Sequence, residues 1–180
     1  LDQGVMGLKV KVGANPQSDI ERIENLREAL GAEIWLAVDA NERYDTGTAL
    51  AMGNFFQDEI GVGWFEEPIS CENIKGHTYL ANKLDIPIAA GEMLFSREEF
   101  HNYVEKSALD IAQPDITRLG GITNTLKLIH YCESQNIPVS PHLLPELAVQ
   151  IGCGLAQVTS VEYMPWFEQL FNEYPKFKAG

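Results

Sequence analysis

The chain has 180 residues, of which 45% are hydrophobic and 22% charged, and 26 Asp and Glu against 13 Lys and Arg give a formal net charge of −13. This composition excludes a disordered, collagen-like or disulfide-scaffold protein, and the acidity argues against nucleic acid or anionic membranes as partners. No apolar run is long enough to span a membrane and no export leader opens the chain, so we expect a cytoplasmic protein. The three widely spaced cysteines form no Cys/His cluster, which predicts buried, reduced thiols and no zinc site: Cys71, Cys132 and Cys153.

Short β-rich runs recur roughly every 25 residues, the spacing of one strand plus one helix with two loops. Seven strands are predicted: Leu8–Val12, Ile34–Val38, Gly63–Phe65, Ile88–Ala90, Ile111–Gln113, Val139–Ser140 and Ser160–Tyr163.

The segments between these strands have helical patterns. Ser18 with Glu21, and Ser96 with Glu99, have the spacing of capping boxes that open helices. The other helices are expected at Thr46–Asp58, Asn73–Leu84, Thr123–Asn136 and Pro145–Ala156, with Asp19–Leu30 after the first capping box. Strands that alternate with helices indicate a parallel sheet, either an open doubly wound sheet or a (β/α) barrel. Because an eight-stranded barrel typically needs about 250 residues, seven strands here predict a barrel with one unit missing.

Polar or ionisable residues stand at the C-terminal ends of nearly all predicted strands, where parallel α/β folds bind their ligands. Asp39, Glu66 and Glu92 end three consecutive strands. Converging carboxylates repel one another and need a cation, and an all-oxygen ligand set suits Mg²⁺, with Mn²⁺ as the second choice. The alternative for each residue alone is a solvated loop acid or one partner of a surface ion pair.

Two lysines lie on the first predicted strand. Side chains alternate along a strand, so Lys9 and Lys11 share one face while Leu8, Val10 and Val12 share the other. If the apolar face packs on helices, both ammonium groups face the polar site, and two neighbouring cations favour loss of a proton from one, which would then act as a base. The alternative is an edge strand with its lysines in water.

A histidine ends the sixth predicted strand. Asp115 ends the strand before that of His142. A carboxylate that is hydrogen-bonded to one imidazole nitrogen fixes the tautomer of the ring and raises the basicity of the other nitrogen. Glu162, on the last strand, either hydrogen-bonds a substrate carboxylate or is a rim acid. The Gly120-Gly121 pair lacks the lysine of a phosphate loop and is expected to be a turn. Three histidines are assigned to helices without a catalytic role: His77, His101 and His130.

Taken together, these residues resemble the enolase superfamily and, within it, the mandelate racemase subgroup. The Lys-x-Lys strand matches Lys9 and Lys11, the three metal ligands match Asp39, Glu66 and Glu92, and the Asp–His dyad and last-strand glutamate match Asp115, His142 and Glu162. A muconate-lactonising enzyme would carry a lysine where Asp115 stands. The segments GEMLFSREEF and QPDITRLGGIT, with Trp166–Glu173, are most similar to acid-sugar dehydratases of the talarate/galactarate type.

The resemblance implies a (β/α) TIM-type barrel holding the second to eighth strands, with the first strand and the N-terminal α+β capping domain absent from this chain. Residues 1–165 would form the partial barrel and residues 166–180 the start of a segment leading to the cap. It also implies a Mg²⁺-dependent lyase that removes the proton α to a carboxylate through an enediolate and eliminates the β-hydroxyl.

The residue roles follow from the same resemblance. Lys11 and His142 would be the acid and base, Lys9 would add positive charge, Asp115 would orient His142, and Glu162 and Asn41 would contact the substrate. The expected partner is a small acid-sugar carboxylate, and the full-length form is expected to be a homo-oligomer. The same two bases would also serve a racemase or epimerase, and two alternatives remain: a non-catalytic metal-binding barrel fragment and a receiver-like phosphoacceptor module built on Asp39.

Overall fold

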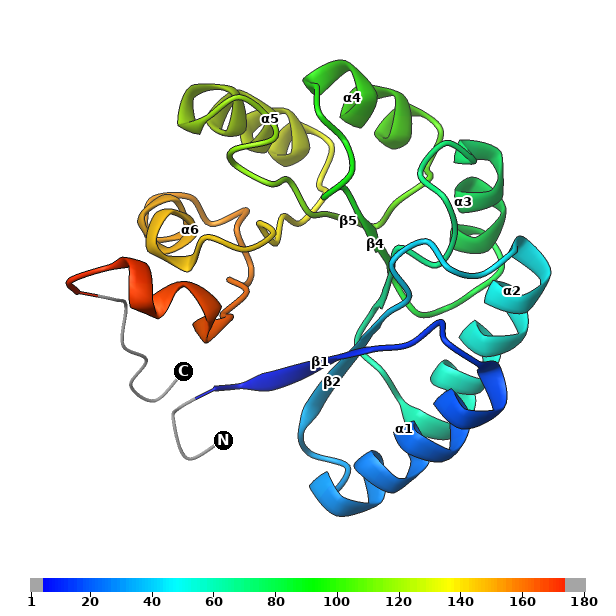
Figure 1. Cartoon of the computed structure of the whole chain (residues 1–180). Coiled ribbons are helices and arrows are strands. Elements are labelled where there is room, and N and C mark those ends of the chain that lie inside the picture. Colours follow the sequence, from blue (N-terminus) through cyan, green and yellow to red (C-terminus); the bar gives the residue numbers. More distant parts are fainter. Residues whose placement is uncertain (1–4, 174–180) are drawn as a thin grey trace. The chain divides into compact units, whose positions relative to one another are not determined.

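The structure is a computed structural model that describes residues 5–173 (Figure 1). The described chain forms two compact units. The first comprises residues 5–89 and 106–109, and the second comprises residues 90–105 and 110–173.

The first unit contains parallel strands that pair in sequence order. They are β1 (Gly7–Lys11), β2 (Trp35–Asp39), β3 (Phe65–Glu66) and β4 (Ile88–Ala90), of which the last residue begins the second unit. A doubly wound sheet, such as that of the receiver-like module, contains a reversal of strand order. The order β1-β2-β3-β4 contains none, so it excludes that module and agrees with a barrel.

The helices of the first unit lie along one face of these strands (Figure 1). They cover a core in which the side chains of Leu36, Val38, Phe56, Phe65 and Ile88 are completely buried. The helices are α1 (Pro16–Leu30), α2 (Thr46–Phe55), the π-helix η1 (Phe56–Ile60) and α3 (Ile74–Ala81).

The start of α1 corrects one prediction. Asn15, not Ser18, caps this helix, and its side chain accepts a hydrogen bond from the Ser18 amide at 3.2 Å. Pro16 at the first helical position explains the earlier start, because its fixed φ suits a helix and its missing N–H would have no helical partner.

The second unit contains α4 (Arg97–Glu105), β5 (Ile111–Ala112), α5 (Ile122–Ser134), α6 (Pro145–Gly152) and the 3₁₀ helix η2 (Pro165–Leu170). The capping box before α4 is confirmed, since the Glu99 amide donates to Ser96 Oγ at 3.2 Å and the Ser96 amide donates to Glu99 Oε2 at 2.8 Å.

The last two predicted strands differ from the structure. Val139 makes only isolated parallel bridges, to Ala112 and Val158, so no extended strand forms at Val139–Ser140. Ser160–Tyr163 is not a strand, and the prediction was wrong there. The chain instead pairs earlier, at Val158 and through the Thr159 amide to the Val139 carbonyl, and a single bridge does not make a ladder.

All three cysteines are free thiols. Only Cys132 is buried, and its burial raises the pKa of that thiol to about 12. Cys71 is half-buried and Cys153 is exposed, so the expectation of buried thiols was wrong for Cys153. Among the described residues, no helix is long and apolar enough to cross a membrane.

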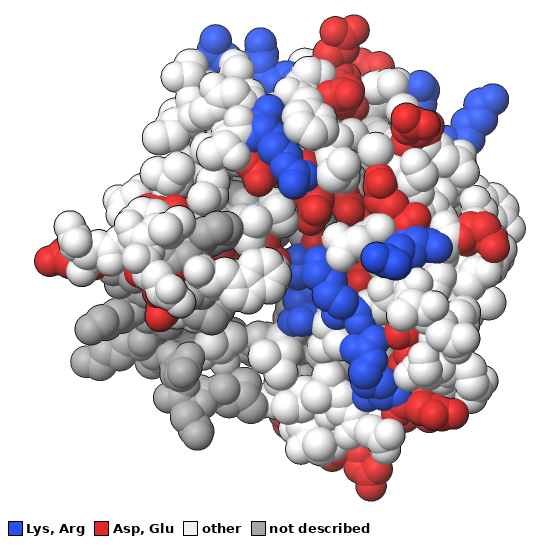
Figure 2. Space-filling model, in the orientation of Figure 1, with Lys and Arg blue, Asp and Glu red and all other residues white. Residues whose placement is uncertain are grey.

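The surface mixes both signs of charge. On the face drawn in Figure 2, basic side chains stand among acidic ones and break up the acidic surface despite the net charge of −13. The three histidines assigned to helices do lie in helices: His77 in α3, His101 in α4 and His130 in α5. In α3 the ring of the buried His77 bonds the Ile69 carbonyl at 3.1 Å.

Candidate active site

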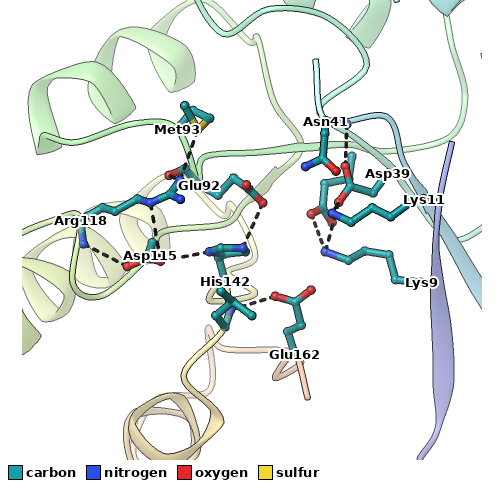
Figure 3. Close-up of polar contacts among 12 residues, drawn as sticks. Lys9, Lys11, Asp39, Asn41, Glu92, Met93, Asp115, Arg118, His142 and Glu162 are labelled. Carbon is teal, nitrogen blue, oxygen red and sulfur yellow. Dashed lines mark hydrogen bonds and ion pairs between the residues drawn. The ribbon is translucent and has the colours of Figure 1, made fainter. Parts of the chain in front are cut away.

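In the first unit, the ends of β1, β2 and β3 bring two lysines and two carboxylates together. Parallel pairing aligns Lys11 with Asp39 and Asp39 with Glu66, so these side chains extend from the same edge of the sheet. Lys9 Nζ lies 2.5 Å from Glu66 Oε1 and 3.6 Å from Asp39 Oδ2, and Lys11 Nζ donates to Asp39 Oδ2 (Figure 3).

The two faces of β1 separate as the alternation predicts. Leu8 and Val10 pack against the apolar core, and Lys9 lies on the other face with its side chain only 14% exposed. A lysine of an edge strand in water would be largely exposed, so that alternative is excluded for Lys9. Lys11, with a side chain 51% exposed, reaches Asp39 from a more open position.

The lysines set the charge state of the buried carboxylate at the end of β2. Burial by itself raises the pKa of Asp39, but the positive charge of Lys9 and the hydrogen bond from Lys11 outweigh it and hold the pKa below its ordinary value. Asp39 is completely buried, and the neighbouring ammonium groups of Lys9 and Lys11 balance the charge of its carboxylate.

The loops that follow these strands contain backbone conformations that L-residues rarely adopt. Asn41 and Glu42, after β2, and Glu67, after β3, have φ of 42°, 64° and 39°. The Asn41 amide donates to Asp39 Oδ1 at 2.8 Å, so the structure shows a backbone contact to the carboxylate. Left-handed non-glycine residues are costly and concentrate at functional sites, which agrees with the predicted role of these strand ends.

Trp64 is a contact of Glu66 that sequence reasoning missed. Its indole Nε1–H donates to Glu66 Oε2 at 3.1 Å. The available signal was the two-residue spacing, because residues i and i+2 of a strand share a face.

In the second unit, His142 lies between two carboxylates (Figure 3). Its Nδ1 is 3.1 Å from Asp115 Oδ2, and its Nε2 is 3.1 Å from Glu92 Oε2. All three residues are buried, with 5–9% of each exposed. The predicted carboxylate–imidazole pair is therefore present in the structure, and a contact with Glu92 is added to it.

Asp115 is held firmly as an anion. Burial raises its pKa, but hydrogen bonds from His142, from the Thr117 hydroxyl and amide and from the Arg118 amide lower it well below its ordinary value. An ionised Asp115 fixes the orientation of the His142 ring through Nδ1.

Arg118 is a second residue that the sequence interpretation did not select. Its guanidinium donates to the Glu92 carbonyl at 2.8 Å, contacts Met93 Sδ at 3.2 Å and lies 3.9 Å from Asp115 Oδ2. It therefore ties the loop after β4 to the loop after β5. A basic residue three positions after the strand-end aspartate was the only signal in the sequence.

Glu162 is placed by a backbone contact. The Leu143 amide donates to Glu162 Oε2 at 2.8 Å, and Leu143 itself has a left-handed φ of 51° directly after His142.

Gly120 and Gly121 form the predicted turn. Gly121 is the N-cap residue of α5, with φ 99°, and its amide donates a hydrogen bond to the Ile116 carbonyl.

The strands are parallel and pair in sequence order, helices alternate with them, and buried ionisable groups lie at their C-terminal ends. These features define the protein as part of a (β/α) barrel. The chain belongs to the enolase C-terminal domain-like family, the model of which matches residues 1–180. The resemblance to the enolase superfamily is therefore confirmed.

Two curated relatives are acid-sugar dehydratases. The chain is 37% identical over 180 residues to the L-talarate/galactarate dehydratase of Salmonella typhimurium, covering 99% of this chain and 45% of that protein. It is 38% identical over 166 residues to the arabinonate dehydratase of Saccharolobus solfataricus, covering 92% and 44%.

A solved structure is similar over almost the same length. The crystal structure of L-talarate dehydratase from Polaromonas sp. JS666, complexed with Mg and L-glucarate, matches with a TM-score of 0.94 and 36% identity, covering 99% of this chain and 50% of that chain. The chain thus spans about half the length of the relatives that it matches.

Proposed function

We propose that these 180 residues carry the catalytic groups of a Mg²⁺-dependent acid-sugar dehydratase, which removes the proton α to a carboxylate and eliminates the β-hydroxyl as water. One observation carries the proposal. Each candidate base contacts a candidate metal ligand within its own unit: Lys11 contacts Asp39 in the first, and His142 contacts Glu92 in the second. A substrate carboxylate held by a metal on Asp39 would lie beside Lys11, and one held by a metal on Glu92 would lie beside His142.

The proposed metal ligands are Asp39, Glu66 and Glu92. Carboxylate oxygens are the ligands that Mg²⁺ prefers, and the lowered pKa of Asp39 keeps that group in the ionised form that binds a cation. Asp39 and Glu66 are register partners on β2 and β3, and β4, which precedes Glu92, pairs with β3 through Ala89 and Glu66. The donor set therefore fits the metal, which when bound supplies Lewis-acid stabilisation of negative charge on the substrate carboxylate.

The acid–base chemistry is assigned to Lys11 and His142. One takes the α-proton, and the other protonates the β-hydroxyl as it leaves, so that the elements of water are lost and an enol remains that rearranges to a 2-keto acid. Asp115 orients His142 through Nδ1, which leaves Nε2, now facing Glu92, as the nitrogen that exchanges protons. Lys11 is the more open of the two lysines, in keeping with direct access to substrate.

The remaining predicted residues are given binding roles. Lys9, half-buried beside both carboxylates, adds positive charge beside the substrate carboxylate. Glu162 would hydrogen-bond the second oxygen of that carboxylate, and the Asn41 side chain would contact the substrate or a metal-bound water. We also propose that the complete protein is a homo-oligomer.

The test uses the protein expressed from its complete reading frame, incubated with Mg²⁺ and a panel of acid sugars. A 2-keto product trapped by semicarbazide, and lost when the metal is removed, is the expected result. Exchange of the α-hydrogen for deuterium without any keto product would overturn the dehydratase proposal and indicate a racemase or epimerase, which needs the same two bases.

A further inference from the structure

The carboxylate of Glu66 is held by two donors of different charge. Lys9 donates to Oε1 at 2.5 Å, and the indole N–H of Trp64 donates to Oε2 at 3.1 Å. Glu66 is 1% exposed and Trp64 9% exposed, so the indole contact is shielded from water. Each carboxylate oxygen has two acceptor sites, so an oxygen that accepts one hydrogen bond can also ligate a cation.

The two donors would act differently on a bound metal. An ammonium group compensates the charge of the carboxylate and so competes with a cation. An indole N–H is neutral, and it orients the carboxylate without competing for its charge. Groups that donate hydrogen bonds to metal-ligand side chains fix the orientation of those ligands, and their removal typically weakens metal binding about 10–100-fold.

The ring of Trp64 is itself held in place. Trp35 packs edge to face against it, with ring centroids 4.7 Å apart and planes at 72°. Trp35 lies over Gly63 so closely that a Cβ at that glycine would be 2.1 Å from its Nε1. The residue before Trp64 must therefore be glycine for Trp35 to occupy this position, and Trp35 in turn supports the indole that faces Glu66.

We propose that Trp64 is a positioning residue of the metal site, which fixes the Glu66 carboxylate through its indole N–H. This inference rests on the proposed function, because it takes Glu66 as a ligand. A purely structural role would be satisfied by the packing of the ring, whereas the positioning role requires the N–H.

The first experiment measures Mn²⁺ affinity by calorimetry and electron paramagnetic resonance, which needs no turnover. Trp64→Phe keeps an aromatic ring and removes the N–H, and we expect the dissociation constant to rise about 10-fold or more. Trp166→Phe is the matched control. It makes the same change at a tryptophan that is 69% exposed and should change the constant less than about 2-fold. Equal affinities of Trp64→Phe and wild type would overturn the inference.

The two failures are distinguishable in the same titration. Failure of the wild type to bind Mn²⁺, or unchanged binding in Glu66→Gln, would refute the metal site of the proposed function. Normal wild-type binding with no loss in Trp64→Phe would refute the role of Trp64 alone.

A second measurement does not depend on whether Trp64→Phe folds. The chain has three tryptophans, so the double variant Trp35→Phe/Trp166→Phe leaves Trp64 as the only one. Mg²⁺ is diamagnetic, and its binding at Glu66 should shift the emission of Trp64 with the same midpoint as the calorimetric titration. Saturating Mg²⁺ binding with unchanged Trp64 emission would contradict the proposal.

Discussion

The two units hold their candidate site residues by different means. In the first unit, strands in continuous register present Lys9, Lys11, Asp39 and Glu66, and ammonium groups compensate buried carboxylates. In the second, the pairing is reduced to a two-residue strand and isolated bridges, and loop contacts centred on Asp115 and Arg118 position His142. Regular pairing thus places the charged cluster, whereas short loops with several side-chain contacts place the histidine.

The largest effect should come from removing the proposed base in each unit. We expect His142→Asn and Lys11→Ala each to lower kcat about 10²–10⁴-fold in the complete protein, because each removes one proton-transfer group. Keto-acid formation is the measurement, and His130→Asn, in an exposed histidine of α5, is the control. Wild-type turnover in either variant would refute the catalytic role of that residue, and no keto-acid formation by the wild type would favour the non-catalytic alternative.

The charge compensation of the first unit is tested by Lys9→Met. This variant removes the ammonium that contacts both Asp39 and Glu66, and the loss of this counter-charge beside two buried carboxylates should cost about 3–5 kcal/mol in the free energy of unfolding, measured in urea. Mg²⁺ should recover part of this loss because it supplies positive charge at the same place.

Lys83→Met, at an exposed position, is the control for that variant and should change stability by less than about 0.5 kcal/mol. If Lys9→Met cost no more than the control, the carboxylates would not depend on Lys9, and the contrast between the units would lose its electrostatic basis.

A pH effect is expected where β1 joins α1. Burial raises the pKa of Asp19, but hydrogen bonds from Arg22, the Gly13 amide and Tyr44 lower it below its ordinary value. A depressed pKa means that the stabilisation is complete above the unfolded-state pKa of about 3.9 and is lost as the pH falls through and below it.

Asp19→Asn should therefore lower the free energy of unfolding by about 2 kcal/mol at pH 7 and by clearly less at pH 3, as measured in urea. Asp58→Asn makes the same change at an exposed site and should show no such trend. A difference between wild type and Asp19→Asn that stays constant from pH 7 to pH 3 would contradict the assignment.

The smallest effect is expected in the loops of the second unit. Arg118→Met removes the bond to the Glu92 carbonyl and the ion pair with Asp115, and should cost about 1 kcal/mol because the guanidinium is partly exposed. Amide hydrogen exchange at residues 92–95 should accelerate relative to an Arg97→Met control. Unchanged exchange there would show that other contacts hold this loop.

The elements that the sequence predicted best are those with local signals. Two such predictions were confirmed, because each depends on spacing along one element. They are the capping box of Ser96 and Glu99, and the alternation of Lys9 and Lys11 with apolar neighbours. The start of α1 was misplaced because Asn15 and Ser18 are both good cap residues, and Pro16 at the first helical position decides for Asn15.

The last predicted strand failed for a different reason. Ser160–Tyr163 has the composition of a strand, but a strand exists only through pairing with a neighbour, and here the neighbouring segment at Val139 pairs with Val158 instead.

The metal-ligand set and the roles of Asn41 and Glu162 remain predictions, as does the domain division at residue 165. The final residues of that predicted C-terminal segment, 174–180, lie outside the described residues.

The sequence by itself determined the strand–helix repeat, the placement of ionisable residues at the strand ends and the resemblance to the enolase superfamily, because periodicity and motif spacing are properties of the linear chain. Only the tertiary structure decided which groups touch: that Lys9 contacts two carboxylates, that Trp64 donates to Glu66, and that His142 lies between Asp115 and Glu92. These contacts depend on strand register and loop conformation, which bring together residues up to 57 positions apart.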